Sequence, residues 1–205
     1  MGVMLVALGL IAVAAYVAWN QISETDGTSS IDGTGFTANV RIGGPFTLTN
    51  HRGEKVTDST YRGRFLFVYF GYGYCPDVCP TELANMAAAL DMLGDKAIAL
   101  QPLFVTVDPE RDSVEFLSEY VGQFHPKFVG LTGTPAEISA VAKSYRVFYR
   151  KANEDNSTEY LVDHSSFVYL MGPNGEFLTM FRGATDPAAM AKTIAAYIDK
   201  RKAGT

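Results

Sequence analysis

Side chains that bind soft metals or perform thiol chemistry are scarce in this sequence, which has two cysteines and three histidines in 205 residues. Any metal site or redox centre must draw on this small set. Positive charge is not in excess either: the formal net charge is -5, which gives no reason to expect a nucleic acid as partner. No internal repeat is visible. A hydrophobic content of 47% is typical of one domain with a sizeable core plus additional segments.

Both cysteines, Cys75 and Cys79, follow the strongest strand signal of the chain. The apolar run Phe65 to Phe70 is rich in aromatic residues and valine and is bounded by glycines, which predicts a buried central strand. The segment after Cys79 is rich in Ala, Leu and Met as far as Leu93, and it predicts a helix that begins at or just before Pro80. The two cysteines are therefore expected at the N-terminus of a helix.

This position favours the thiolate, because free backbone N–H groups and the positive end of the helix dipole stabilise negative charge. The C-x-x-x-C spacing places the sulfurs of Cys75 and Cys79 one helical turn apart, within reach of one small ion or of each other. A redox C-x-x-C motif is one residue shorter, so the spacing favours metal capture over a general oxidoreductase. Three interpretations stay open: a metal site, a dithiol redox pair and a plain structural disulfide.

A third metal ligand has to come from elsewhere in the chain, and His164 is the best candidate among the histidines. It stands directly before the predicted strand Phe167 to Met171. If that strand lies near the central one, the loop leading into it can face the cysteine loop. The alternative is an ordinary loop histidine held by Asp163 or Ser165.

The other two histidines fit a metal site less well. His125 precedes Pro126 at the end of a predicted helix, where a capping or surface role is expected. His51 lies in a turn and is expected in solvent. Two thiolates and one imidazole form a soft, low-coordinate set that suits Cu(I) and can also hold Cu(II). A structural zinc site closes four ligands and would need a carboxylate such as Asp163.

Three segments of the chain together resemble the Sco/SenC family of membrane-tethered, copper-binding, thioredoxin-like proteins. They are GYGYCPDVCP at 71–80, VDPERD at 107–112 and VDHSSFVYLMGPNGEF at 162–177. The upstream segment GGPFTLTNHRGEKVT resembles the hairpin lead-in of that family. The resemblance covers the chain from about Gly43 to Ala196. One departure is Gly73, which stands where the family often has threonine.

The resemblance implies that Cys75, Cys79 and His164 bind copper, as the matching residues of the family do. It also implies a role in assembling the dinuclear copper centre of cytochrome c oxidase. The implied partners are the copper-binding subunit of that oxidase and an upstream copper donor. Asp163 matches the acidic neighbour of the family's histidine, and an orienting role for it follows from the way imidazole ligands are usually held.

Met1 to Trp19 contains no charged side chain and is dominated by Val, Leu, Ile and Ala. At about 19 residues it is just long enough to span a bilayer, and we interpret it as a membrane anchor, with a cleaved signal peptide as the alternative. The resemblance, and a cysteine site that needs an oxidising compartment, place the rest of the chain outside the cytoplasm. A bacterial inner membrane facing the periplasm is favoured over the mitochondrial one, because no transit peptide is visible.

The remaining chain divides into a flexible polar linker, residues 20–39, and a domain, residues 40–205. The domain is predicted to begin with a hairpin from Phe46, followed by the Phe65 strand and its helix. A second apolar strand, Ala99 to Val107, is expected parallel to the first, because a helix connects the two. Further expected elements are a helix from Asp112 or Ser113 to Phe124, strand Phe128 to Leu131, a helix from Thr134 to Tyr145, strand Tyr145 to Lys151, a polar loop 152–159, a hairpin of strands Phe167 to Met171 and Glu176 to Phe181, and a helix from Asp186 to about Lys200.

This order predicts an α/β, thioredoxin-like fold. A central mixed sheet is flanked by helices, with an N-terminal hairpin extension and an N-terminal transmembrane helix. Sites in such sheets lie at the carboxyl ends of strands, where Cys75 and Asp108 both fall. Asp108 is either a hydrogen-bond acceptor beside the site or the lead of an Asp-Pro turn. Tyr72 and Tyr74 either pack on the strand or shield a bound metal.

The leading functional hypothesis is a copper chaperone, not a turnover enzyme, that holds copper on Cys75, Cys79 and His164 and passes it on by ligand exchange. The rival is a thiol–disulfide reductase that uses the cysteine pair as a dithiol to keep the target's cysteines reduced, and both roles can coexist. A peroxiredoxin-like peroxidase is disfavoured, because neither cysteine stands in that family's T-x-x-C arrangement. A tethered domain with a structural disulfide predicts no metal binding after reduction.

Overall fold

The computed structural model describes residues 41–152 and 160–203. The predicted anchor, 1–19, and linker, 20–39, lie outside these residues, as do positions 153–159 of the predicted polar loop. Within the described ranges, no helix is both long enough and apolar enough to cross a membrane.

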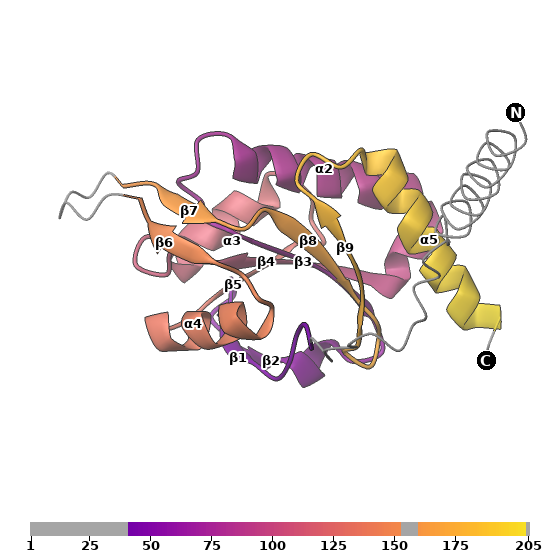
Figure 1. The fold of residues 1–205 in the computed structure, drawn as a ribbon, viewed down its shortest axis with the longest axis horizontal. Coiled ribbons are helices and arrows are strands. Elements are labelled where there is room, and N and C mark those ends of the chain that lie inside the picture. The colour runs from indigo at the N-terminus through magenta and orange to yellow at the C-terminus, as the bar shows by residue number, and fades with distance from the viewer. Residues whose placement is uncertain (1–40, 153–159, 204–205) are drawn as a thin grey trace, which may run out of the picture. The chain divides into compact units, whose positions relative to one another are not determined.

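A seven-stranded mixed sheet forms the centre of the fold (Figure 1). In spatial order its strands are β2 (Lys55–Thr57), β1 (Thr47–Asn50), β5 (Val129–Thr132), β4 (Leu100–Thr106), β3 (Phe65–Gly71), β8 (Phe167–Met171) and β9 (Phe177–Arg182). Strand β3 is parallel to β4 and antiparallel to β8, and β4 is parallel to β5. The predicted parallel pair and both predicted hairpins, β1–β2 and β8–β9, are confirmed.

Strand β3 carries the centre of the core, because all seven of its residues are buried. It has a strand neighbour on each side and helices near it, so neither of its faces meets water, which is why its sequence is a continuous apolar run. Parallel pairing with β4 runs from Phe65 opposite Leu100 to Gly71 opposite Thr106. The carboxyl ends of both strands therefore meet at one edge of the sheet, where the cysteine loop begins.

Helices cover the sheet, and Figure 1 shows α2 and α5 side by side, with α4 on the opposite side of the strands. Their bounds are α2 (Val78–Leu93), α3 (Val114–Gly122), α4 (Pro135–Ser144) and α5 (Pro187–Ala203), with short 3-10 helices η1 (Asp58–Tyr61) and η2 (Gly94–Ala99). The capping box predicted at Thr134 is confirmed, since its side chain and that of Glu137 each accept the other's backbone N–H.

Two short strands depart from the predicted order. The strand predicted over Tyr145 to Lys151 is only β6 (Tyr149–Lys151), because Tyr145 closes α4 and Arg146 takes a positive φ of 60°. Strand β7 (Val162–His164) was not predicted. It pairs antiparallel with β6 in a separate two-stranded sheet. Neither strand has an apolar run of its own, so local sequence carries little signal for them.

Candidate metal centre

The structure brings Cys75, Cys79 and His164 together. One ligand atom from each, two sulfurs and a ring nitrogen, lies within 4.8 Å of the other two. Metal bonds of about 2.3 Å to sulfur and 2.0 Å to nitrogen span almost this separation, so one ion could touch all three atoms after a small closure. Both thiols are free, which gives no support to the structural-disulfide interpretation. This is the one such cluster within the ranges that the structure describes.

The helix geometry explains why the two cysteines differ. Cys79 lies in the first turn of α2, on the stripe that Leu83, Met86 and Leu90 continue into the core at helical spacing. It is fully buried as a result. Cys75 precedes the helix in the loop after β3 and is half-buried. One sulfur therefore faces the interior, and the other borders the solvent.

The N-terminus of α2 stabilises negative charge on Cys75. The backbone N–H of Cys79 donates to the Cys75 sulfur over 3.4 Å. The pKa of the Cys75 thiol is lowered to about 3, first by the hydrogen bond from the Cys79 thiol, and also by His164 and by the backbone N–H groups of Asp77 and Cys79, against the effect of burial. The pKa of Cys79 is raised, because its proton is held by the Cys75 sulfur and because it is buried. The two opposite pKa shifts favour a thiolate on Cys75 and a thiol on Cys79 in the metal-free chain.

His164 reaches the sulfurs from the end of β7. Its Nε2 lies 3.3 Å from the Cys79 sulfur, and its Nδ1 lies 3.2 Å from the carbonyl oxygen of Ser165. The rings of Tyr69 and Tyr72 meet the imidazole edge-to-face, with centroids 6.1 and 5.9 Å away. These contacts fix the plane of the ring and leave Nε2 directed at the sulfurs.

Tyr72 and Tyr74, which were predicted either to pack on the strand or to shield a bound metal, differ in their surroundings. Tyr72 is buried against His164, as expected of a side chain that shields the site. Tyr74 is 51% exposed and stacks on Phe116, away from the imidazole. Tyr69 was missed as a neighbour of the site, because its place in the apolar β3 run indicated only core packing.

Asp163 points away from the cluster, since neighbouring residues of a strand face opposite sides. Its carboxylate is exposed and pairs with Nε of Arg150 at 3.2 Å, across the β6–β7 pair. The contact that the structure shows at Nδ1 of His164 is the Ser165 carbonyl. The orienting role of Asp163 stays a prediction.

The other two histidines lie outside the cluster. The expectation that His51 is in solvent was wrong: it is half-buried, and its Nδ1 accepts the backbone N–H of Gly130 over 3.0 Å. Burial, and then the charge of Arg52, lower its pKa. His125 accepts the N–H of Lys127 in the loop after α3, which agrees with a local structural role.

Comparison with known proteins points the same way as the sequence motifs. A profile of the SCO1/SenC family matches residues 35–199. The chain belongs to the SCO1/SenC family.

Relatives in this family come from mitochondria and bacteria. The mitochondrial SCO1 homolog of Homo sapiens is 45% identical over 159 residues, which are 77% of this chain and 53% of that protein. A SCO2-like protein of Rickettsia prowazekii is 43% identical over 143 residues, 69% of this chain and 70% of that protein. The crystal structure of Arabidopsis thaliana ScoI with copper bound is similar with a TM-score of 0.73 and 43% identity, covering 78% of this chain and 99% of that one.

The chain spans about half the length of the human protein. The likeness to the Arabidopsis structure confirms the predicted α/β, thioredoxin-like fold with a central mixed sheet flanked by helices.

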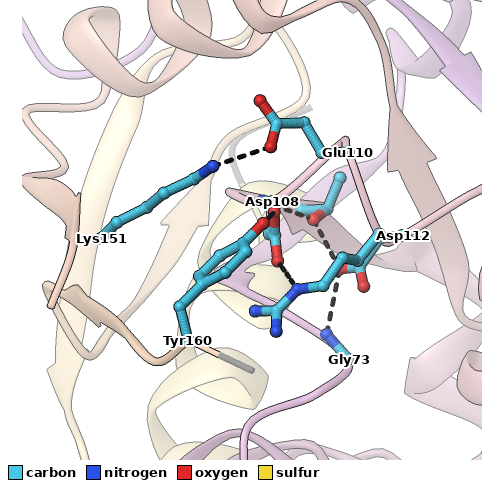
Figure 2. Close-up of polar contacts among 8 residues, drawn as sticks. Gly73, Asp108, Glu110, Asp112, Lys151 and Tyr160 are labelled. Carbon is cyan, nitrogen blue, oxygen red and sulfur yellow. Dashed lines mark hydrogen bonds and ion pairs between the residues drawn. The ribbon is translucent and has the colours of Figure 1, made fainter. Parts of the chain in front are cut away.

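Gly73, the departure noted among the sequence motifs, lies against Phe116 and Asp112. A Cβ atom here would overlap the ring of Phe116 and lie 3.1 Å from Oδ1 of Asp112. The backbone N–H of Gly73 donates to Oδ2 of Asp112 over 3.0 Å (Figure 2). The Phe116 ring, stacked on Tyr74 with centroids 5.0 Å apart, therefore fills the space of the missing side chain.

We expect Gly73→Thr to lower the free energy of unfolding by about 1–3 kcal/mol, the usual cost of overpacking a filled site. Phe116→Ala should recover part of that loss in the double variant, because the overlapping ring is gone. Urea unfolding of the parent, the two single variants and the double variant measures the coupling. Gly122→Thr is the matched control, since Gly122 faces open space. Strictly additive losses at Gly73 and Phe116 would contradict this account of the departure.

Proposed function

We propose that this chain binds one copper ion through Cys75, Cys79 and His164 and delivers it to the dinuclear copper centre of cytochrome c oxidase. The observation that carries the proposal is the convergence of two sulfurs and one imidazole nitrogen within 4.8 Å. This donor set is soft and low-coordinate, which suits Cu(I) and also accommodates Cu(II). Copper in the related Arabidopsis structure supports the choice of metal.

The surroundings of the cluster suit ligand exchange. An open pocket beside it is lined by residues that include Cys75, Val78, Leu161 and His164. A ligand of the receiving protein can enter on this side while Cys79, on the buried side, still holds the ion. With three protein ligands, copper keeps room for the incoming atom before a donor leaves. The chain acts as a carrier in this scheme, with copper as cargo and no turnover chemistry of its own.

Copper uptake by the reduced full-length chain tests the proposal. We expect one copper per chain by metal analysis, with sulfur-to-copper charge-transfer absorbance when Cu(II) is bound. The control is the same chain oxidised to the Cys75–Cys79 disulfide, which should retain no copper because both thiolates are consumed. A reduced chain that retains no copper after desalting would end the chaperone proposal.

A second function, thiol–disulfide reduction of the target's cysteines, is favoured by the state of Cys75. Its sulfur is partly accessible and its pKa is lowered, as expected of an attacking thiol. The Cys75 thiolate would attack a target disulfide to form a mixed disulfide. The Cys79 sulfur would then attack the Cys75 sulfur and release the target. The products are a Cys75–Cys79 disulfide, one target thiol that carries the Cys79 proton and one target thiolate that takes a proton from water, so electrons and protons balance. The assay is the stoichiometric reduction of a disulfide peptide by the metal-free chain.

The N-terminal segments extend this proposal. Residues 1–19 would anchor the chain in a membrane and residues 20–39 would act as a tether, so that the domain of residues 40–205 works outside the cytoplasm. The expected partners are the copper-binding oxidase subunit and an upstream copper donor. Extraction of membranes with carbonate tests the anchor, because a spanning segment keeps the chain in the membrane pellet.

A further inference from the structure

The strand that carries His164 is not part of the central sheet. Strands β6 and β7 pair only with each other among the described strands, whereas the cysteines follow β3 at the centre of the fold. His164 itself has no partner in the main-sheet ladder, although β8, which pairs with β3, begins three positions later at Phe167. The other end of β7 is held by side-chain contacts, and a dense set of them gathers around Tyr160.

Tyr160 is the centre of these contacts. Its side chain is buried, and its hydroxyl donates a hydrogen bond of 2.6 Å to Oδ1 of Asp108 (Figure 2). Asp108 is itself buried, and its other oxygen pairs with Nε of Arg111. The bond joins residues 52 positions apart, from the loop after β4 to the chain just before β7. A buried hydrogen bond to a carboxylate is among the stronger kinds.

The ring of Tyr160 lies between two cations. The guanidinium carbon of Arg111 is 3.7 Å from the ring centroid, and Nζ of Lys151 in β6 is 4.4 Å from it. Lys151 also pairs with Glu110 over 2.7 Å, which ties β6 to the same loop. Figure 2 shows the Lys151–Glu110 pair beside the hydrogen-bonded Tyr160 and Asp108. The cation–π contact of Arg111, whose side chain is only 16% exposed, adds to the hydrogen bond, whereas that of the exposed Lys151 adds less.

The same loop reaches the cysteine side of the site. The guanidinium carbon of Arg111 lies 5.8 Å from the ring centroid of Tyr72 and 4.9 Å from that of Tyr74. Asp112, one residue further, accepts the backbone N–H of Gly73 and the hydroxyl of Thr106. The loop between β4 and α3 is thus fastened to the segment before Cys75.

We propose that Tyr160, through Asp108 and Arg111, is a positioning residue that sets how firmly His164 closes on the two sulfurs and so how fast copper leaves the site. This inference rests on the proposed copper-carrier function. Only three residues separate Tyr160 from His164, so a less firmly held Tyr160 lets the imidazole withdraw. An imidazole that withdraws easily opens the position that an incoming ligand needs.

Copper release from the loaded full-length chain tests the inference. Tyr160→Phe keeps the ring between the cations and removes only the hydroxyl, so transfer of copper to an excess of chelator should become about tenfold faster. Tyr160→Leu also removes the ring, and its release should be faster still, by about a hundredfold. Charge-transfer absorbance should stay at the parent's wavelength, because all three ligands remain.

The matched control is Tyr197→Phe, which also removes one hydroxyl, here from a 3.2 Å bond to the Leu178 carbonyl between α5 and β9. It should lower the thermal midpoint by less than Tyr160→Phe does, because the lost bond is to a neutral carbonyl, and it should leave copper release unchanged. If Tyr160→Phe releases copper at the parent's rate, the inference is overturned.

A metal-free measurement separates failure of the inference from failure of the proposed function. In the reduced apo chain, amide hydrogen exchange of a peptide covering β7 should be faster in Tyr160→Phe than in the parent, with exchange in β3 unchanged. If the parent binds no copper, the carrier function fails. The exchange rates then test only whether Tyr160 holds β7 in place. Unchanged exchange in β7 would then overturn it.

Discussion

Replacing His164 by alanine is expected to weaken copper retention by at least about 100-fold, while the cysteine pair still reduces a disulfide peptide. Removing even an outer partner of a ligand costs about 10–100-fold in metal affinity, so losing the ligand itself should cost more. The two sulfurs remain, since Cys75 and Cys79 lie on a loop and helix that do not depend on β7. Competition with a chelator of known affinity measures the loss, and peptide reduction measures the thiol chemistry.

His125→Ala is the matched control for this prediction. It removes the same side chain at a half-buried position whose Nδ1 accepts the N–H of Lys127, outside the metal cluster. Copper affinity should stay at the parent's value. Equal affinity of the His164→Ala variant and the parent would remove the imidazole from the site and leave a dithiol, which favours the reductase.

Alkylation of the metal-free chain is expected to proceed at Cys75 with a rate that is nearly flat from about pH 4 to pH 8. The pKa of Cys75 is lowered from 9.0 to about 3, so its thiolate persists as pH falls and is lost only near pH 3. An ordinary thiol loses thiolate by tenfold per pH unit over this interval, because it lies below its pKa. Across these four pH units the two profiles therefore diverge by roughly four orders of magnitude.

The prediction concerns how the alkylation rate of Cys75 depends on pH and not its absolute value. A thiolate of low pKa is intrinsically a weaker nucleophile, which offsets much of its greater abundance at neutral pH. Mass spectrometry of peptides after timed alkylation assigns the reaction to each cysteine. Cys79 should react slowly throughout, since it is buried and its pKa is raised. In the Cys75→Ser variant the flat component should disappear, and a flat component that persists would assign the thiolate to Cys79 instead.

The copper affinity of His164→Ala and the alkylation profile of Cys75 both test how the chain would take up copper. Under the proposed function, the Cys75 thiolate at the rim of the site would capture a metal ion without first losing a proton, and Cys79 would follow once the ion displaced its proton. His164 would then bind from the end of β7. Mutating the rim sulfur and mutating the imidazole therefore test different stages of loading.

Much of the fold could be predicted because its signals are local. The apolar run of β3, the helix after Cys79 and the capping box at Thr134 each depend on residues within about one turn or one strand of each other. The proximity of the two sulfurs is also local, since only three residues separate the two cysteines at the start of a helix. These features were confirmed within a residue or two of their predicted bounds.

Contacts across the sheet could not be predicted in the same way. Cys79 and His164 are 85 residues apart, and their 3.3 Å contact depends on β7 pairing with β6, a strand pair with no strong pattern of its own. The half-buried place of His51 depends on β1 lying beside β5. Neither arrangement is encoded in the neighbouring residues.

The sequence by itself determined the paired sulfurs at a helix start, the order of the main elements and, through its motifs, the Sco/SenC family. Only the tertiary structure decided that Asp163 turns to Arg150, that Cys79 is buried while Cys75 is not, and that Tyr160 fastens the histidine strand to the loop after β4. The physical reason is the distance along the chain over which the interactions act. Secondary structure follows from nearby dihedral and hydrophobic preferences, whereas the direction of a side chain follows from which distant segment the packed sheet places against it.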